Sequence, residues 1–265
     1  ADAVVSIEDR GFQFGDGVYE VIRTYRGQPF AIEEHLARLE RSAQALQLSI
    51  GQTRAQWSSL IREGLRLSQF PEAKIYLQIT RGQAPRDHPF PVSSAPTTVL
   101  TFRELHPLDV SVRNAGVQAM SVEDIRWGRC DIKSVNLLAN VLARQRAKEA
   151  GVFEAILVRE GTVTEGSVSN VMVVRNGAVQ TAPEGRRILS GVTRTIVLDL
   201  ARKEGIPVAE SFVTREELLA ASEVFLTGTT VEVLPVVRVD GHAIGGGSPG
   251  PVSQLLSRRF EALVG

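Results

Sequence analysis

Lys133 is the side chain whose type and position point most directly to covalent chemistry. It lies in residues 130–137, and apolar residues recur at helical spacing after it until Gly151, so we expect a helix to begin just beyond the lysine. Flanking Ile132 and Val135 would limit the access of water to its amine. Desolvation lowers the pKa of a lysine and makes available the neutral nucleophile that a Schiff base requires. The alternative interpretation is an ordinary solvated surface charge.

Glu165 lies in a second segment with possible chemistry, residues 161–171. The dipeptide Asn176-Gly177 follows this segment between two apolar runs, which is a strong signal for a β-hairpin. Glu165 is therefore expected at the end of a strand in a sheet-rich region. The alternative interpretation is a solvated carboxylate in a turn.

The two segments, DIKSVNLLAN and VTEGSVSN, resemble motifs of the class IV aminotransferases, which are pyridoxal-phosphate enzymes of fold type IV. Within this family the chain is most similar to the bacterial D-amino acid aminotransferases, from residue 6 to about residue 241. Two long, ordered motifs are a more specific signal than one short motif. The resemblance implies a two-domain α+β fold. A smaller α/β domain would span residues 1–107, a linker 108–112, and a larger sheet-rich domain that binds pyridoxal 5′-phosphate 113–265.

The resemblance also implies cofactor-binding roles for three side chains. Lys133 would hold pyridoxal phosphate as a Schiff base, and Glu165 would keep the pyridine nitrogen protonated so that the ring can withdraw electrons. Arg38, in the HLARL segment of residues 35–39, would bind the cofactor phosphate, because a guanidinium offers paired donors and a permanent charge. A helix-surface ion pair is the alternative for Arg38.

A phosphate site is expected at the start of a helix that follows Gly191. Free N–H groups there, at Val192 and Thr193, would attract an anion, although an ordinary N-cap would also explain Thr193. Gly228 and Thr229 would complete the site. Gly228 and Val168 stand where the nearest relatives in the family have serines, so cofactor binding is expected to be weaker or differently hydrated.

Three further residues are expected to bind the substrate. Tyr19 lies in an alternating strand, residues 18–25, and the resemblance places its phenol beside the substrate carboxylate. Arg86 and His88 lie two apart in a proline-rich loop and match the R-x-H pair that holds the α-carboxylate in the family, reaching in from the partner subunit. The resemblance thus implies a homodimer with shared active sites. A packed strand tyrosine and an exposed polar loop are the alternatives.

The composition indicates which binding partners and which cellular compartment to expect. The chain has 265 residues, and Lys+Arg and Asp+Glu are equal at 30 each, so no basic surplus suggests nucleic acid or an anionic membrane. The single cysteine, Cys130, excludes an internal disulfide framework and suits a reducing cytoplasm. With no long apolar run and no recognisable signal peptide, a cytoplasmic protein is expected. His106 and His242 lack neighbouring metal ligands, so no metal site is expected.

The predicted reaction is a ping-pong transamination from a D-amino acid, of the D-alanine or D-glutamate type, to a 2-oxo acid such as 2-oxoglutarate or pyruvate. Pyridoxamine phosphate would be the cofactor form between the two halves. Three alternatives on the same fold remain: a branched-chain L-amino acid transaminase, an (R)-amine transaminase and an aminodeoxychorismate lyase. A non-catalytic binding module is a further alternative, which the presence of Lys133, Glu165 and Arg38 together disfavours.

Hydrophobic periodicity predicts the elements that position these residues. The predicted strands cover residues 18–25, 74–82, 97–103, 117–122, 153–158, 170–174, 178–181 and 223–226. The predicted helices cover residues 32–46 and 53–67, the stretch after Lys133, the stretch that contains residues 196–201, and a closing segment from about residue 252.

Overall fold

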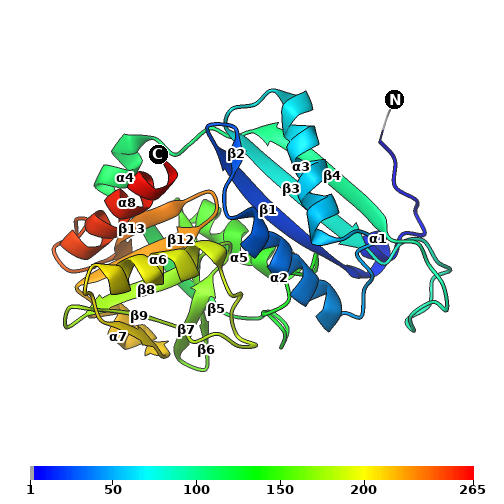
Figure 1. Ribbon diagram of the computed structural model, residues 1–265. Coiled ribbons are helices and arrows are strands. Elements are labelled where there is room, and N and C mark those ends of the chain that lie inside the picture. The colour runs from blue at the N-terminus through cyan, green and yellow to red at the C-terminus, as the bar shows by residue number, and fades with distance from the viewer. Residues whose placement is uncertain (1–2) are drawn as a thin grey trace. The chain divides into compact units, whose positions relative to one another are not determined.

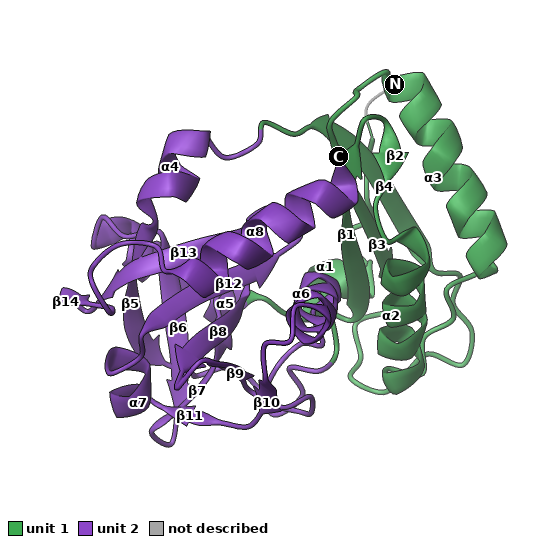
Figure 2. Ribbon diagram, turned by 60° about the vertical axis from the view of Figure 1, so that its left-hand side comes forward, with its two compact units in different colours: residues 1–106, 132–137 green, residues 107–131, 138–265 purple. Residues whose placement is uncertain are grey.

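A computed structural model describes residues 3–265, and the chain groups into two compact units (Figure 1, Figure 2). Unit 1 comprises the residues up to His106 together with Ile132–Leu137, and unit 2 comprises Pro107–Asp131 and Leu138–Gly265. The segment with Lys133 therefore groups with the N-terminal unit, although its neighbours along the chain on both sides group with unit 2. Helices and curled sheet together confirm the expected α+β class.

Unit 1 is built on a four-stranded antiparallel sheet with the order β2-β1-β3-β4. Helices α2 and α3 pack against each other and on this sheet, and Thr53 begins α3 with a capping box to Gln56. The unit's elements are α1 (Arg10–Phe14), β1 (Gly17–Tyr25), β2 (Gln28–Pro29), α2 (Ile32–Ala45), α3 (Arg54–Ser68), β3 (Ala73–Thr80) and β4 (Thr97–Glu104). The predicted strands and helices of this unit are confirmed, and the short helix α1 was not among the predicted elements.

The segment that carries Lys133 runs alongside β1 instead of starting a helix. The Tyr19 N–H donates to the Lys133 carbonyl at 3.0 Å, and the Val135 N–H donates to the Gly17 carbonyl at 3.1 Å. The next helix, α5, begins only at Leu138, so the predicted start just beyond Lys133 was wrong. The reason is that backbone N–H and C=O groups that are hydrogen-bonded to a strand cannot also form the hydrogen bonds of a helix.

Unit 2 is built on a sheet with the order β10-β9-β8-β12-β13-β5-β6-β7-β11, to which β14 adds beside β13. Helix α5 packs on β6, α6 on β12 and α8 on β13. The strands are β5 (Val117–Glu123), β6 (Glu154–Arg159), β7 (Thr162–Gly166), β8 (Asn170–Arg175), β9 (Ala178–Thr181), β10 (Val208–Glu210), β11 (Val213–Thr214), β12 (Glu223–Gly228), β13 (Glu232–Val239) and β14 (His242–Ala243). The helices are α4 (Val110–Ala115), α5 (Leu138–Glu149), α6 (Val192–Lys203), α7 (Arg215–Leu219) and α8 (Pro251–Val264).

Sequence signals account for much of unit 2. Asn176 and Gly177 have φ angles of 50° and 76°, as the predicted hairpin between β8 and β9 requires. The central strands β8 and β12 are buried along nearly their whole length, which is why they read as continuous apolar runs. Among the helices that the structure describes, none combines the length and the apolar character needed to span a membrane.

Candidate active site

Lys133 lies against an aromatic ring within unit 1. Its ammonium nitrogen is 4.4 Å from the centre of the Tyr19 ring, and the Lys133 N–H donates to the Ser42 hydroxyl at 3.1 Å. The Tyr19 ring in turn lies 5.6 Å from the ring of Tyr76. Because Tyr19 and Lys133 are also joined by a backbone hydrogen bond, the amine and the phenol are positioned by the same strand pairing.

Arg38 lies in a buried network of charged and polar groups in unit 1. Its Nε and Nη2 atoms donate to the two carboxylate oxygens of Glu20 at 2.7 and 2.8 Å, and His35 Nδ1 lies 2.8 Å from the same carboxylate. Glu20 is fully buried on the face of β1 that also carries Val18. The ion pair expected as the alternative for Arg38 thus exists, but it is buried and not on a helix surface; phosphate binding by Arg38 stays a prediction.

Burial and charge shift the pKa values in this network in definite directions. Burial alone would raise the pKa of Glu20, but the charge and hydrogen bonds of Arg38 and His35 outweigh it and hold that pKa well below its usual range. Burial lowers the pKa of His35, and the positive charges of Arg38 and Lys133 lower it further. The charge and hydrogen bond of Glu20 raise it, but by less than the other effects lower it. His35 is therefore neutral near pH 7, and it adds no positive charge beside the amine of Lys133.

Glu165, near the end of β7 in unit 2, is buried and accepts several hydrogen bonds. It accepts hydrogen bonds from Arg126, from the Asn170 amide at 3.0 Å and from the Leu189 N–H at 3.1 Å. Arg126 is itself clamped by Asp124 through two bonds of 2.9 Å. Burial alone would lower the pKa of Arg126, but its hydrogen bonds to Asp124 and the charge of Glu165 outweigh burial and raise it. A buried carboxylate with this support suits pairing with a protonated ring nitrogen.

The expected phosphate donors Val192 and Thr193 are buried in the first turn of α6. No side chain of the described residues caps this helix at Gly191, so the helix start keeps its positive dipole end for an anion. A Cβ atom on Gly191 would overlap the side-chain oxygen of Asn170, which places the helix start directly beside a partner of Glu165.

The end of β12 supplies a second observation that fits a phosphate. The Thr227 hydroxyl is fully buried, and no hydrogen-bond partner lies within its reach in the part of the chain that the structure describes. Next to it, Gly228 packs near the Val168 carbonyl, 3.7 Å from where a Cβ atom would lie. The fit to a phosphate thus rests on a buried, unpartnered donor beside Gly228 and on the uncapped start of α6.

The serine-containing loop after Glu165 has a structural role that sequence reasoning missed. The hydroxyls of Ser167 and Ser169 both donate to Glu154, a carboxylate that is only 1% exposed. Val168, which stands in place of a family serine, is 66% exposed. The signal for Glu154 was a lone acidic residue at the head of an otherwise apolar strand, which predicts a buried charge with specific partners.

Arg86 and His88 lie exposed in the loop between β3 and β4 of unit 1. Both side chains approach the same ring, because the Arg86 guanidinium is 4.7 Å and the His88 ring 5.5 Å from the centre of Phe14. The structure therefore brings the expected carboxylate-binding pair together on one aromatic support.

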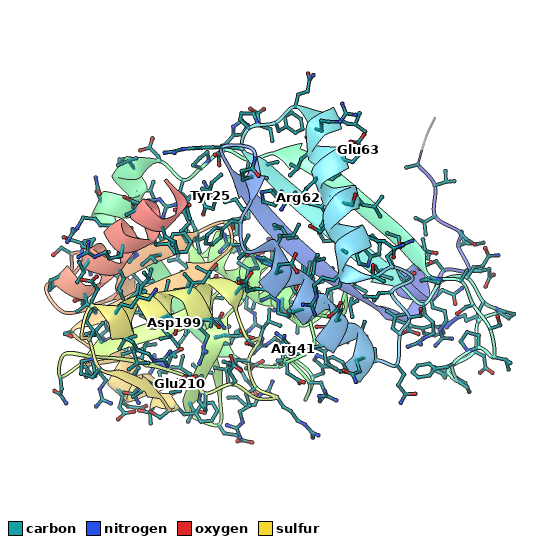
Figure 3. All side chains as sticks on the ribbon, in the orientation of Figure 1. Tyr25, Arg41, Arg62, Glu63, Asp199 and Glu210 are labelled. Carbon is teal, nitrogen blue, oxygen red and sulfur yellow. The ribbon has the colours of Figure 1, made fainter. Side chains whose placement is uncertain are left out.

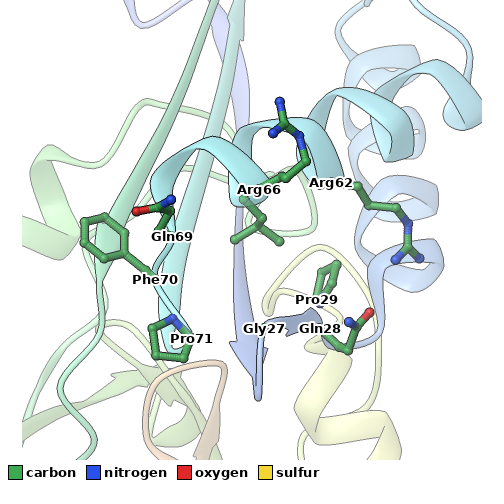
Figure 4. Close-up of a pocket in the computed structure, with 9 residues that line it drawn as sticks. Gly27, Gln28, Pro29, Arg62, Arg66, Gln69, Phe70 and Pro71 are labelled. Carbon is green, nitrogen blue, oxygen red and sulfur yellow. The ribbon is translucent and has the colours of Figure 1, made fainter.

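Other features of the described surface give no reason to assign chemistry. A hollow of about 420 Å³ between the end of α3 and the β1–β2 turn is lined by residues that include Arg62, Arg66 and Phe70, and it contains none of the expected site residues (Figure 4). Glu63 and Asp199, labelled in Figure 3, belong to exposed ion pairs with arginines. Solvent screens such pairs, so they contribute little to stability or recognition.

Comparison with known proteins adds sequence and structural relatives. Residues 17–239 match the amino-transferase class IV family. A D-alanine aminotransferase from Bacillus licheniformis is 46% identical over 262 residues, covering 98% of this chain and 92% of that protein. A D-alanine aminotransferase from Staphylococcus haemolyticus is 43% identical over 263 residues, covering 99% and 93%.

Solved structures with the same fold include branched-chain amino acid aminotransferases. The enzyme of the archaeon Thermoproteus uzoniensis, solved with norvaline, superposes with a TM-score of 0.91 at 28% identity, covering 99% of this chain and 90% of that one. The Escherichia coli enzyme superposes with a TM-score of 0.90 at 28% identity, with the same coverage. A further branched-chain enzyme, solved with pyridoxamine 5′-phosphate, superposes with a TM-score of 0.93 at 30% identity, again with this coverage.

Proposed function

The chain belongs to the class IV aminotransferase family, and we propose that it moves the amino group of a D-amino acid, of the D-alanine or D-glutamate type, to a 2-oxo acid such as 2-oxoglutarate or pyruvate. The observation that carries this choice is the high identity, over almost the whole chain, to enzymes named for D-alanine. The branched-chain enzymes share the fold at much lower identity. Arg86 and His88 support the same choice.

The cofactor is pyridoxal 5′-phosphate, which when bound accepts the amino group and acts as the electron sink for the carbanion. Lys133 would hold it covalently, and Glu165 would pair with its pyridine nitrogen. The phosphate would be bound by the residues expected from the sequence, Arg38, Val192, Thr193, Gly228 and Thr229. The uncapped start of α6 and the buried hydroxyl of Thr227 support this assignment.

Residues of unit 1 would transfer the α-proton of the substrate and bind its carboxylate. Once the amino group of the substrate has displaced it from the cofactor, the Lys133 amine would take the α-proton of the amino acid and pass it to the cofactor carbon that bears the amino group. The amine must be neutral to take up this proton. Because His35 is neutral near pH 7, it places no additional positive charge beside that amine. The Tyr19 phenol would donate to the substrate carboxylate, and Arg86 with His88 would clamp it, so that the α-proton of a D-amino acid faces Lys133.

We propose further that the enzyme is a cytoplasmic homodimer with shared active sites. Each unit exposes apolar side chains that a second copy would cover. On unit 1 these include Ile7 and Phe12, each 75% exposed, and Phe90 at 53%. On unit 2, helix α5 exposes Leu138 at 69% and Val141 at 57%. The free, buried thiol of Cys130 is compatible with a reducing compartment.

The test of the function is a half-reaction of the cofactor-loaded protein with one amine at a time. D-alanine, L-leucine and (R)-1-phenylethylamine are mixed separately with the enzyme, and loss of the visible absorbance band of the bound cofactor is followed. We expect rapid conversion by D-alanine alone. The Lys133→Ala protein is the matched control and is expected to show no conversion.

Other outcomes of this experiment favour specific alternatives. Conversion by L-leucine would favour the branched-chain activity, which the solved relatives make the strongest alternative. Conversion by the amine would favour an (R)-amine transaminase. In a separate assay with aminodeoxychorismate as substrate, release of pyruvate without amino transfer would favour the lyase.

A further inference from the structure

Arg10 in the short helix α1 is a buried arginine that reaches the loop carrying Arg86 and His88. It is 3% exposed, and its Nε atom donates to Asp16 at 2.9 Å. Its two terminal nitrogens donate to main-chain carbonyls of the loop, that of Asp87 at 2.6 Å and that of His88 at 3.1 Å. One guanidinium thus fixes the backbone at and between the two expected clamp residues.

The base of the same loop is closed by backbone contacts. The Arg10 N–H donates to the Gly82 carbonyl at 2.9 Å, and the Ala84 N–H donates to the Glu8 carbonyl at 3.2 Å. Gly82 has a φ angle of +91°, and a Cβ atom there would overlap the Ala95 carbonyl, so only glycine fits. The loop is therefore held at its base and near its tip by the residues around α1.

Asp16 connects this anchor to a second arginine. Arg81 donates to the same carboxylate at 2.8 and 3.0 Å, and its guanidinium lies 3.7 Å from the centre of the ring of Phe90, a later residue of the loop. Burial alone would raise the pKa of Asp16, but its hydrogen bonds to Arg81 and Arg10 outweigh burial and lower it. Asp16 therefore stays ionised and keeps both guanidinium groups in place.

Phe14 links the anchor to the clamp side chains. Its ring lies 4.9 Å from the guanidinium carbon of Arg10 and 4.7 Å from that of Arg86. Stacking of a guanidinium on an aromatic face is favourable and directional. Arg10 therefore affects both the backbone and the side-chain support of the clamp.

We propose that Arg10 is a positioning residue for recognition of the substrate carboxylate, acting through the loop and not by touching the substrate. The proposal rests on the proposed function of Arg86 and His88 as the carboxylate clamp. Arginine is required because its fork of N–H groups reaches three acceptors at once, the Asp16 carboxylate and two carbonyls, whereas lysine offers a single ammonium group on a flexible stem.

The test compares Arg10→Lys with the unaltered enzyme and with Arg66→Lys, a matched change at an exposed ion pair on α3. We expect Arg10→Lys to raise the KM for D-alanine and for pyruvate about tenfold with kcat nearly unchanged, as loss of substrate binding without loss of chemistry requires. The absorbance of the bound cofactor should not change. Trypsin should cleave after Arg86 faster than in the unaltered protein, which reports the loop without reference to activity. Arg66→Lys should match the unaltered enzyme.

Phe14→Leu is the second variant, in case Arg10→Lys does not fold. It is also expected to raise the KM and to speed cleavage by trypsin after Arg86. Arg86→Leu serves as the reference for a damaged clamp, and D-alaninamide, which lacks the carboxylate, measures how far each protein prefers the acid. Loss of that preference in Arg10→Lys or Phe14→Leu, as in Arg86→Leu, supports the proposal.

Two results would overturn the positioning role of Arg10. They differ in whether the carboxylate clamp of Arg86 and His88 is still supported. If Arg86→Leu loses the preference for the acid while both anchor variants keep it and resist trypsin normally, the clamp stands and Arg10 does not position it. If Arg86→Leu also keeps the preference, the clamp itself is wrong and the role of Arg10 falls with it.

Discussion

At the scale of single residues, two buried carboxylates that lie near expected site residues each face an arginine. Glu20 faces Arg38 and His35 in unit 1, and Glu165 faces Arg126 in unit 2. Removing one member of such a pair is costly because the remaining charge stays buried without compensation. These contacts fix where the ionised groups lie before any substrate arrives.

Sequence reasoning singled out Arg38 and Glu165 as cofactor-binding residues but missed the partners that hold them. Arg38 and Glu165 lie in motifs of the family, whereas Glu20 and Arg126 acquire their importance only from neighbours brought close by folding. For Glu20 a signal existed, because it shares the inward face of β1 with Val18 and a charge at such a position demands a partner. Which partner it takes could not be read from spacing.

His35 makes stability depend on pH, and His35→Gln should remove this dependence. Its pKa is lowered from an ordinary value of 6.5, so below pH 6.5 the unfolded chain binds a proton that the folded protein does not. The free energy of unfolding should therefore fall as the pH drops from 6.5 toward 5, by up to about 1.4 kcal/mol per pH unit.

Urea unfolding at several pH values checks this prediction. His35→Gln should flatten the curve between pH 6.5 and 5, whereas His242→Gln, at an exposed histidine, should leave it unchanged. An equally steep curve in His35→Gln would show that another group is responsible.

Gly228→Ser should be tolerated and should strengthen cofactor binding. A Cβ atom at this position would lie 3.3 Å from a methyl group of Val231 and at least 3.7 Å from other atoms, so little must move. A new hydroxyl donating to a phosphate would raise affinity about tenfold, as expected for a hydrogen bond to a charged group.

Titration of the cofactor-free protein with pyridoxal phosphate measures the effect of Gly228→Ser. Gly246→Ser is the control, since a Cβ atom at Gly246 comes no nearer than 4.0 Å to the Ser248 hydroxyl. Unchanged affinity in Gly228→Ser would mean that this residue does not face the phosphate.

At the scale of elements, alternation and helical periodicity predicted most strands and helices, because one face of each is buried. The start of α5 is the clearest failure. Leu138 and Leu142 looked like the apolar face of a core helix, yet they are 69% and 48% exposed, and the buried face carries Ala143 and Ala147. Periodicity identifies an apolar face but not what covers it.

The start of α6 depends on Gly191, and Gly191→Ala should weaken cofactor binding and lower stability. The added methyl group would overlap the Asn170 side chain, which donates to Glu165 and to the Leu189 carbonyl just before the helix. Overpacking of this kind typically costs about 1–3 kcal/mol. Thermal unfolding and cofactor titration, each compared with Gly246→Ala, check the prediction. Full stability and affinity in Gly191→Ala would show that the helix start moves freely.

At the scale of the whole molecule, a shared active site predicts that two variants with different defects can complement each other in a mixed dimer. Lys133→Ala lacks the amine and Arg86→Leu lacks the clamp. If Arg86 acts on the partner subunit's site, a mixed dimer contains one complete site. Random exchange of subunits in a two-fold dimer should then restore about a quarter of the normal activity.

The rescue experiment needs only mixing, dissociation and reassociation of the two purified variants, followed by a transamination assay. Each variant mixed with itself is the control. No recovery after proven subunit exchange would mean that Arg86 serves the site of its own chain, and a monomer with full activity would exclude shared sites altogether.

The grouping of Ile132–Leu137 with unit 1 has a consequence for how the protein is made. A ribosome finishes β1 to β4 long before it reaches Lys133, so the nascent N-terminal unit must wait for a later stretch of chain to bring in the reactive amine. Polypeptides released before residue 132 would carry the sheet and helices α1, α2 and α3 of this unit and yet lack the reactive amine. Protease digestion of ribosome-bound chains of increasing length should show β1 gaining further protection once residue 137 has emerged.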